Sequence, residues 1–510
     1  MRTTWDGSWL RTVSAVTNQY STESANLTGK GSKNMRFTRI QPRTLAHVTL
    51  SACLIVITGN VLFGPVVSAK DWPQWRGVER LGVWTETGIV DDFPDTGLTV
   101  KWRVPIHGGY SGPAVADGRI FVLDYDETEP RTMDGTERLL ALDENTGDVL
   151  WTHEWTTTYR MLMFTYATGP RATPTVDGNR VYVTGSTGRI LCLDVETGAV
   201  QWEKDTVAEY DTNIPVWGTS SAPLIDGDRV IFLVGGEPDA LVMAFDKHTG
   251  EEVWRALESR TEMGYNQPLI VDAGGARQLI VWHPRGLSSL DPATGELYWE
   301  EPFEGRANMT VADAVMSGSY LFVSGFYSGS MMMRLDLDRP AAVVVWKDGS
   351  NRMLEDGIEI AEETGLHSVM TTPIVTDGYI YGIGSHGQVR GLRAETGERL
   401  WEAEGLTNRN RWGSAYFVRH EDRYFVYNEN GDLIIARFTP EGYVELDRTH
   451  LLSPTSQSGY GGSRIGSASR FRHGRSDRLV VWAHPAFANR HVVLRNDEEI
   501  IRVSMDANDY

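Results

Sequence analysis

A short phrase that recurs along the chain constrains the fold more than any other feature. It reads ALDENTGDVLW at residues 141–151, and it returns as CLDVETGAVQW, AFDKHTGEEVW and SLDPATGELYW. Two degenerate copies end at Trp346 and Trp401, so successive phrase-ending tryptophans lie 45 to 55 residues apart. A period of this length is typical of propeller blades, because one four-stranded blade occupies about 40–50 residues.

Each copy of the phrase predicts a tight turn followed by an outer strand. Glycine adopts a positive φ at low cost, and the Asp and Thr side chains can hydrogen-bond the turn backbone. We expect the tryptophan on the outer strand to pack against the neighbouring blade, which buries a large ring. The residues assigned this structural role are Asp143, Gly147, Trp151, Asp194, Gly198, Trp202, Asp246, Gly250, Trp254, Asp291, Gly295 and Trp299.

A second pattern alternates with the first and marks the innermost strands. Stretches such as PAVADGRIFVLD, at residues 113–124, predict a short strand, a glycine turn and a longer alternating strand. Such stretches begin near residues 113, 174, 223, 268, 311, 373, 415 and 485. No segment has the period of a long amphipathic helix. The sequence therefore predicts an all-β fold, an eight-bladed β-propeller of four-stranded antiparallel blades.

The two ends of the repeat region complement each other. The last blade has no outer strand of its own, whereas residues 98–106 (LTVKWRVPI) form an outer-type strand outside any blade. We predict that this N-terminal strand closes the ring by completing the last blade, which leaves no free sheet edge there. The chain then divides into a non-native or disordered extension (1–34), a signal peptide (35–69), an N-terminal strap (70–97) and a single propeller (98–510).

Residues 35–69 are typical of an export signal. Three arginines between residues 36 and 43 precede an apolar stretch at 48–63 and a small-residue ending at 67–69. Polar residues and a proline interrupt the stretch too early for a good membrane span. We expect cleavage near Ala69, a periplasmic or extracellular location, and no integral membrane span in the mature chain. The true start site, lipidation at Cys53 and the oligomeric state stay open.

Charge and composition exclude several function classes. The net charge is −20 at pH 7, and removing residues 1–69 makes it more negative, which argues against binding nucleic acid. None of the 12 histidines has a zinc-type spacing. The stretch GIGSHG at 382–387 lies between two predicted strands, so it indicates a turn rather than a dinucleotide site. The sequence therefore predicts no catalytic and no metal-binding residues.

The LDxxTGxxxW phrases resemble those of the PQQ-binding-like β-propeller repeat family, the pyrrolo-quinoline quinone repeat. The stretch DWPQWRG at 71–77 and residues 482–500 are also similar to exported members of this group. The resemblance implies the fold more strongly than the function, because quinoprotein dehydrogenases and the BamB subunit of the outer-membrane assembly machinery share the repeat. Quinoprotein alcohol dehydrogenases also carry adjacent cysteines and a bound Ca²⁺. This chain lacks adjacent cysteines, so PQQ with Ca²⁺ is not the favoured cofactor.

The loops that lead into the innermost strands meet at one mouth of a propeller channel, which is the default ligand site. In this chain they are rich in aromatic, amide, histidine and arginine side chains, which can line a pocket or satisfy one another. The candidate ligand-binding residues are His107, Tyr110, Arg171, Trp217, Tyr265, Asn266, Gln267, His367, Arg411, Trp412 and His484.

These features favour an exported, non-catalytic binding or scaffolding module of the cell envelope. Its predicted occupant is a protein partner or a small ligand at the channel mouth, of unknown identity. Two alternatives stay open. One is a quinoprotein-type oxidoreductase that depends on PQQ and Ca²⁺, and the other is a BamB-like outer-membrane protein assembly factor.

Overall fold

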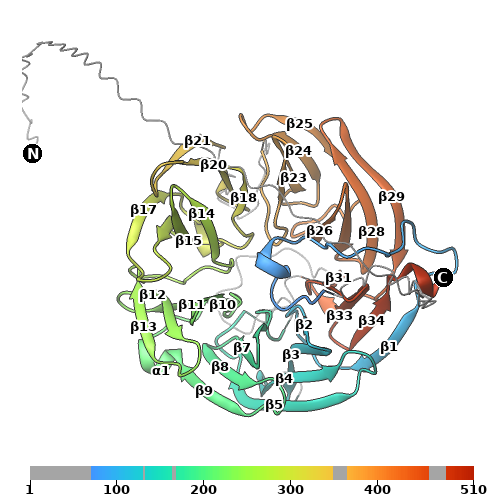
Figure 1. The fold of residues 1–510 in the computed structure, drawn as a ribbon, viewed down its shortest axis with the longest axis horizontal. Helices are drawn as coiled ribbons and strands as arrows, with labels where there is room; N and C mark the ends of the chain where they lie inside the picture. The colour runs from blue at the N-terminus through green and yellow to red at the C-terminus, as the bar shows by residue number, and fades with distance from the viewer. Residues whose placement is uncertain (1–69, 130–131, 164–167, 349–364, 459–477) are drawn as a thin grey trace, which may run out of the picture. The chain divides into compact units, whose positions relative to one another are not determined.

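Eight four-stranded antiparallel sheets surround a common axis in the computed structural model (Figure 1). The structure describes residues 70–510 except 130–131, 164–167, 349–364 and 459–477. All of the described residues belong to one unit, Pro65–Tyr510. The predicted extension 1–34 and export signal 35–69 lie outside the described residues. The prediction of an all-β, eight-bladed propeller is confirmed.

The first four blades each follow the chain from the innermost strand to the outermost. Blade one comprises β2 (Ala114–Ala116), β3 (Arg119–Glu127), β4 (Asp134–Asp143) and β5 (Val149–Thr158). Blade two comprises β6 (Thr175–Asp177), β7 (Arg180–Thr184), β8 (Arg189–Asp194) and β9 (Val200–Asp205). Blade three comprises β10 (Leu224–Asp226), β11 (Arg229–Gly236), β12 (Ala240–Asp246) and β13 (Glu252–Ala256). Blade four comprises β14 (Leu269–Ala273), β15 (Ala276–His283), β16 (Gly286–Leu290) and β17 (Leu297–Pro302).

Three more blades repeat this order. Blade five comprises β18 (Val315–Ser317), β19 (Tyr320–Gly325), β20 (Gly329–Leu335) and β21 (Ala342–Lys347). Blade six comprises β22 (Ile374–Thr376), β23 (Tyr379–Ile383), β24 (Val389–Arg393) and β25 (Arg399–Ala403). Blade seven comprises β26 (Ala415–His420), β27 (Arg423–Asn428), β28 (Asp432–Thr439) and β29 (Gly442–His450). The innermost strand of blade five thus begins four residues after position 311, which the sequence pattern indicated.

Blade eight is built from both ends of the described chain. Its strands run in the order β32 (Ala486–Ala488), β33 (His491–Arg495), β34 (Glu499–Ser504) and β1 (Val100–Pro105). Strand β1 pairs antiparallel with β34, with Pro105 opposite Glu499. The predicted closure of the ring by the N-terminal strand is therefore confirmed.

Few elements lie outside the blades. A two-stranded ribbon joins β30 (Ser456–Gln457) to β31 (Leu479–Val480). Short 3-10 turns occur at Val78–Arg80, Arg306–Asn308 and Ala507–Asp509. The one α-helix in the described ranges, α1 (Thr206–Tyr210), has 5 residues, and no helix there has the length and apolar character needed to cross a bilayer.

Four of the repeated tryptophans each join their own blade to the next. In these blades the indole Nε1–H on an outer strand donates a hydrogen bond to a backbone carbonyl in the turn of the following blade. The accepting residue directly follows the aspartate that begins the turn, or the arginine that replaces this aspartate in blade six. The donor–acceptor pairs are Trp151–Val195, Trp202–Lys247, Trp254–Pro292 and Trp346–Ala394, at 2.8 to 3.1 Å.

The same contact seals the joint between the last blade and the first. Trp102 of β1 donates to the carbonyl oxygen of Glu144 at 2.9 Å, and its ring covers Gly147. A Cβ atom added at Gly147, whose φ is +79°, would lie 2.8 Å from the Trp102 ring. Asp143 accepts backbone hydrogen bonds from residues 145 and 146, both at 2.9 Å. The turn phrase therefore shapes a flat glycine surface on which the neighbouring indole lies.

Trp299 departs from this arrangement. Its Nε1–H donates to Oε1 of Gln278 in its own blade, at 2.8 Å. The turn of the following blade, at residues 336–341, contains no glycine, so it offers no equivalent flat surface. The regular contact thus depends on the turn glycine as well as on the tryptophan.

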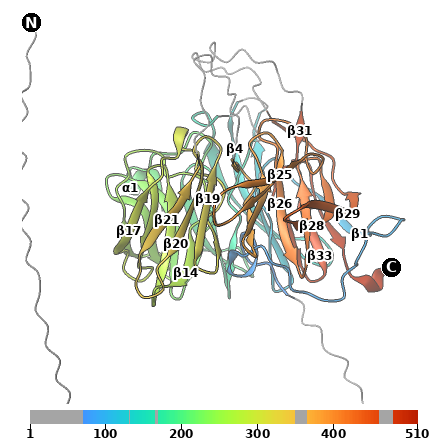
Figure 2. The ribbon, with the colours of Figure 1, turned by 90° about the horizontal axis from the view of Figure 1, so that it is seen from above.

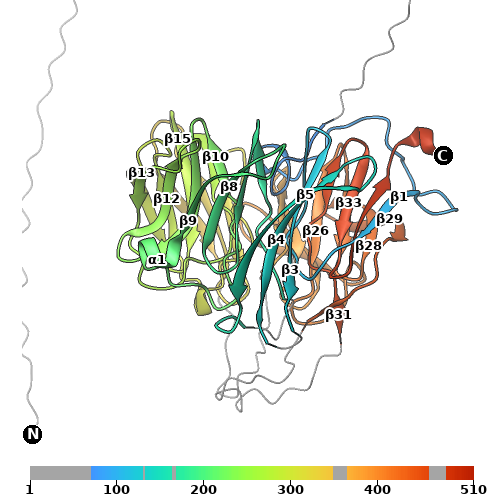
Figure 3. The same cartoon turned by 90° about the horizontal axis from the view of Figure 1, so that it is seen from below.

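Residues 70–97 cross one end of the ring. The segment pairs with blade one through Trp72 and Val115 and with blade seven through Val83 and Arg419. Arg80, which is 5% exposed, donates to the backbone carbonyls of blades three and four, including the Pro268 oxygen at 3.2 Å. Figure 1 shows the 3-10 turn of this segment near the axis, and Figure 2 and Figure 3 show the segment and β31 at opposite ends of the ring. The loops that lead into the innermost strands lie at the β31 end, because residues 481–485 directly follow β31 and lead into β32.

Candidate functional site

A cavity of about 150 Å³ lies where the loops into the innermost strands meet. All eight blades and the 70–97 segment contribute to its wall. The fourteen described lining residues are Trp75, Tyr110, Arg171, Trp217, Ser220, Tyr265, Gln267, Met309, Val311, Val369, Met370, Trp412, Tyr416 and Trp482.

The wall follows a register that repeats around the ring. In seven blades a lining residue lies four positions before the first residue of the innermost strand, because equivalent loops place equivalent positions around the axis. In blade seven that position is Arg411, and the next residue, Trp412, lines the cavity instead. The seven residues in register are Tyr110, Arg171, Ser220, Tyr265, Val311, Met370 and Trp482.

This register divides the wall into two halves of different chemistry. Blades one to four present two phenols, a guanidinium and a hydroxyl, whereas blades five to eight present valine, methionine and two tryptophans. Arg171 is 8% exposed, and its guanidinium lies 4.6 Å from the centre of the Tyr110 ring. Its Nη1 donates to the Gly169 carbonyl oxygen at 3.1 Å. The cavity is therefore polar and positively charged on one side and apolar on the other.

Three carboxylates, those of Asp313 and Glu429 buried and that of Glu262 half-buried, hold wall rings from behind. Asp313 accepts the Trp75 indole N–H at 2.7 Å, and Glu262 accepts the Tyr265 hydroxyl at 2.8 Å. Glu429 faces the Trp482 indole N–H at 3.4 Å. Side chains that are hydrogen-bonded beneath a wall are fixed before any ligand arrives, which is the arrangement that preorganised binding sites require.

Burial raises the pKa of Glu429 and of three tyrosines in the wall. It raises the pKa of Glu429 to about 7, although Arg478 lies 2.6 Å away and favours the carboxylate. Burial likewise raises the pKa values of Tyr110, Tyr265 and Tyr416, so the wall phenols carry their protons at neutral pH. Among the lining residues at pH 7, Arg171 is thus the charged one.

Of the eleven candidate residues from the sequence, six line the cavity. They are Tyr110, Arg171, Trp217, Tyr265, Gln267 and Trp412. Gln267 also links neighbouring loops, since its amide nitrogen donates to the Ser220 carbonyl oxygen at 3.2 Å.

The structure places the other five candidates away from the wall. His107 is a rim residue whose Nδ1 lies 3.7 Å from Asp126, and Asn266 is buried with its amide on the Thr310 carbonyl oxygen. The remaining three are buried or engaged nearby: the His367 ring nitrogen faces the Phe326 carbonyl, Arg411 bonds the Tyr327 hydroxyl, and His484 lies between the Trp75 and Tyr416 rings. Burial lowers the pKa of His484 to about 3, so it is neutral in the folded protein.

Sequence reasoning missed eight wall residues. Four of them occupy the register position and Val369 stands beside one of these, so a comparison of equivalent loop positions would have found all five. Trp75 had no such signal, because its place depends on the distant Asp313. The eight are Trp75, Ser220, Met309, Val311, Val369, Met370, Tyr416 and Trp482.

A quinone with calcium, which the family resemblance implies, does not fit this wall. Calcium takes about six to eight oxygen ligands, and none of the fourteen described lining residues carries a carboxylate. The three carboxylates beneath the wall already hold its rings. In the described ranges, no group of three or more His, Cys, Asp or Glu side chains is arranged to hold a metal. The volume is also below the about 300–1,000 Å³ typical of larger ligands.

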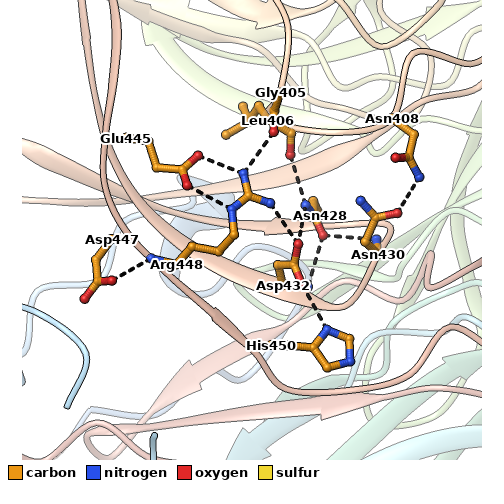
Figure 4. A network of polar contacts seen from close by, with 10 residues as sticks. All are labelled: Gly405, Leu406, Asn408, Asn428, Asn430, Asp432, Glu445, Asp447, Arg448 and His450. Atoms are coloured by element: carbon orange, nitrogen blue, oxygen red, sulfur yellow. Dashed lines mark hydrogen bonds and ion pairs between the residues drawn. The ribbon is translucent and has the colours of Figure 1, made fainter. Parts of the chain in front are cut away.

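A separate polar network ties the edge of blade seven to the loop that precedes it (Figure 4). Asp432 accepts hydrogen bonds from His450 at 2.9 Å and Arg448 at 2.8 Å, and Arg448 also donates to the Gly405 carbonyl oxygen. Burial opposes ionisation of Asp432, but the hydrogen bonds from His450 and Arg448 hold its pKa below the usual value. We assign this network a structural role, because its donors and acceptors satisfy one another.

Comparisons with known proteins agree with this architecture. The family model described as "Outer membrane protein assembly factor BamB" matches residues 94–159 and 135–403. The BamB of Moranella endobia is 25% identical over 266 residues, which cover 49% of this chain and 62% of that protein. A quinoprotein ethanol dehydrogenase of Pseudomonas aeruginosa is 30% identical over 164 residues, which cover 29% of this chain and 26% of that protein. The chain thus spans less than two thirds of the length of either relative.

A solved structure shares the fold. The quinohemoprotein alcohol dehydrogenase from Comamonas testosteroni aligns with a TM-score of 0.52 at 13% identity, covering 86% of this chain and 80% of that one. At this identity the likeness concerns the fold alone. Because the family model matches more than half of the sequence and the eight-bladed fold agrees, the chain belongs to the family of the outer membrane protein assembly factor BamB.

Proposed function

We propose that this chain is an exported binding or scaffolding module of the cell envelope and that the cavity at the channel mouth is its binding site. The observation that carries the proposal is the wall itself. Its aromatic rings line the cavity, and the carboxylates behind the wall accept hydrogen bonds from those rings. This supports binding rather than quinone-dependent oxidation, and the signal-like residues 35–69 support the envelope location.

Membership of the family favours a more specific second candidate. One relative is named an outer membrane protein assembly factor, so we propose a scaffold in that process as the alternative role. The two candidates differ in the partner that the channel mouth contacts, and they are separated by identifying that partner.

Site-specific photo-crosslinking in living cells tests the proposal. The probe is placed at Met161, which is 83% exposed on the mouth side, or at Leu337, which is 78% exposed in a turn on the opposite side. We expect a discrete adduct from position 161 that weakens in a Tyr265→Ala variant, and none from position 337. An adduct with an outer-membrane assembly component would select the second candidate.

A thermal melt with PQQ and Ca²⁺ provides the opposing test. A ligand that binds only the native state adds about 2.7 kcal/mol of stability at a concentration one hundred times its Kd, and so raises the melting temperature. We expect no shift. A dose-dependent rise, together with reduction of an electron acceptor in the presence of an alcohol, would overturn the proposal in favour of an oxidoreductase.

A further inference from the structure

The size of the cavity limits what it can hold. Its volume is about 150 Å³, and an apolar cavity of about this size accommodates one benzene ring. Trp412, Trp482 and Met370 form the apolar half of the wall. Aromatic and thioether groups make favourable contacts with an inserted ring. The volume and the apolar half together select a single six-membered ring rather than a fused ring system.

The polar half selects the substituent on that ring. Arg171 contributes a guanidinium that is 8% exposed, and Ser220 of the next blade lines the cavity with its hydroxyl donated to the Tyr265 carbonyl oxygen at 2.9 Å. The Gly169 carbonyl oxygen and the Tyr110 ring fix the position of the guanidinium. A guanidinium in a cavity of low dielectric bonds a carboxylate through charge-assisted hydrogen bonds, which are about twice as strong as neutral ones.

Aromatic walls also attract cations, so that alternative has to be weighed. Arg171 itself lies over the Tyr110 face that a ligand cation would otherwise use. The carboxylates of Glu262 and Glu429 lie behind the wall, where they are bonded to Tyr265 and to Arg478. A second cation would therefore meet the charge of Arg171 inside the cavity, whereas an anion meets an opposite charge.

We infer that the cavity binds a monocyclic aromatic carboxylate, with the ring against Trp412 and Trp482 and the carboxylate directed to Arg171. The inference rests on the proposed function, since it names the ligand of the same site. It adds a specificity that the blade repeat does not encode, because the charge comes from blade two whereas the apolar rings come from blades seven and eight.

Isothermal titration with three matched probes tests the inference on the unaltered protein. The probes are benzoate, the neutral benzamide and the cation benzyltrimethylammonium. We expect benzoate to bind at least tenfold more tightly than benzamide, and the cation not to displace it. Arg171→Gln should bring benzoate and benzamide to within about threefold of each other. Arg255→Gln, on the outer strand β13, is the matched control and should leave the preference unchanged.

Three outcomes would overturn the inference. Equal affinities for benzoate and benzamide would show that Arg171 does not select a carboxylate. A higher affinity for benzyltrimethylammonium would show that the cavity prefers cations. The probe series on the unaltered protein remains decisive if Arg171→Gln does not fold. Absence of heat and of any melting shift with all three probes at millimolar concentration removes the ligand class. The crosslinking from position 161 then reports separately on the proposed function.

Discussion

The tryptophans of the blade joints and those of the cavity wall bond differently through their indole nitrogens. In the joints between blades, Trp151 and its equivalents donate to a backbone carbonyl of the next blade. In the cavity wall, Trp75 and Trp482 face side-chain carboxylates, those of Asp313 and Glu429. A backbone acceptor is present at every equivalent turn whatever the sequence. A carboxylate has to be supplied by one particular residue. The indole hydrogen bond therefore recurs from joint to joint, whereas each indole bond in the wall depends on its own acidic residue.

The largest expected effect concerns the joints. Gly147→Ala places a Cβ atom 2.8 Å from the Trp102 ring, on a backbone whose φ is +79°. Strain at positive φ costs about 1–2 kcal/mol and overpacking about 1–3 kcal/mol more, so we expect a loss of about 4 kcal/mol. Gly118→Ala has a φ of +73° and open space around its Cβ, so it should lose only about 1 kcal/mol. Urea unfolding of both variants measures the difference.

Equal losses in the two glycine variants would show that the ring on the turn contributes nothing beyond backbone strain. In that case the joint tryptophans would stabilise the fold only through the apolar surface that their rings bury.

The second prediction concerns the carboxylates behind the wall. The folded state raises the pKa of Glu429 from 4.5 to about 7 through burial, so between these values it binds a proton more tightly than the unfolded chain does. Stability from this group is therefore present below about pH 4.5 and is lost as the pH rises to about 7. The loss amounts to about 3 kcal/mol at 1.36 kcal/mol per unit.

Comparison of the protein with Glu429→Gln at several pH values isolates this contribution. The difference in unfolding free energy should change between pH 4.5 and 7 and stay flat on either side. The neutral His484 acts in the opposite direction, below its ordinary pKa of 6.5, and cancels in the difference. Glu441→Gln, at an exposed turn, is the control. A difference that does not vary with pH would contradict the buried, proton-retaining carboxylate.

The smallest expected effect compares the two indole environments directly. Trp75→Phe and Trp151→Phe each keep an aromatic ring and remove one N–H donor. Hydrogen bonds to charged groups contribute about 1.5–3 kcal/mol and neutral ones about 1 kcal/mol, so we expect losses of about 2 and about 1 kcal/mol. Thermal or urea unfolding of the two variants measures both. A larger loss for Trp151→Phe would mean that the joints, not the wall, depend on the indole proton.

The same difference explains which parts of the molecule the sequence predicts. The blade count follows from a repeated local pattern of turn glycines, prolines and tryptophans, and the closure by β1 follows from the one outer-type strand that this pattern leaves outside a blade. For the cavity, the sequence identifies the loops but not the direction of each side chain. His367 and His484 were expected in the wall because they lie in the right loops. His367 instead faces the Phe326 carbonyl of the preceding blade, and His484 lies behind the wall between the Trp75 and Tyr416 rings. The position four residues before each innermost strand predicts which side chains face the cavity. This position can be identified only after the sequences of the blades have been aligned with one another.

The closure of blade eight has a consequence for biosynthesis. Strand β1 is made about 400 residues before β34, the strand it must pair with. At about 5–20 residues per second, a ribosome takes roughly 20–80 s to cover that distance. During that time β1 has no strand to pair with, although the Glu144 turn that Trp102 contacts is made only 42 residues after it, and any nascent chain cut short leaves β1 unpaired. The completed ring therefore distinguishes finished molecules from truncated ones, in which β1 keeps a free sheet edge.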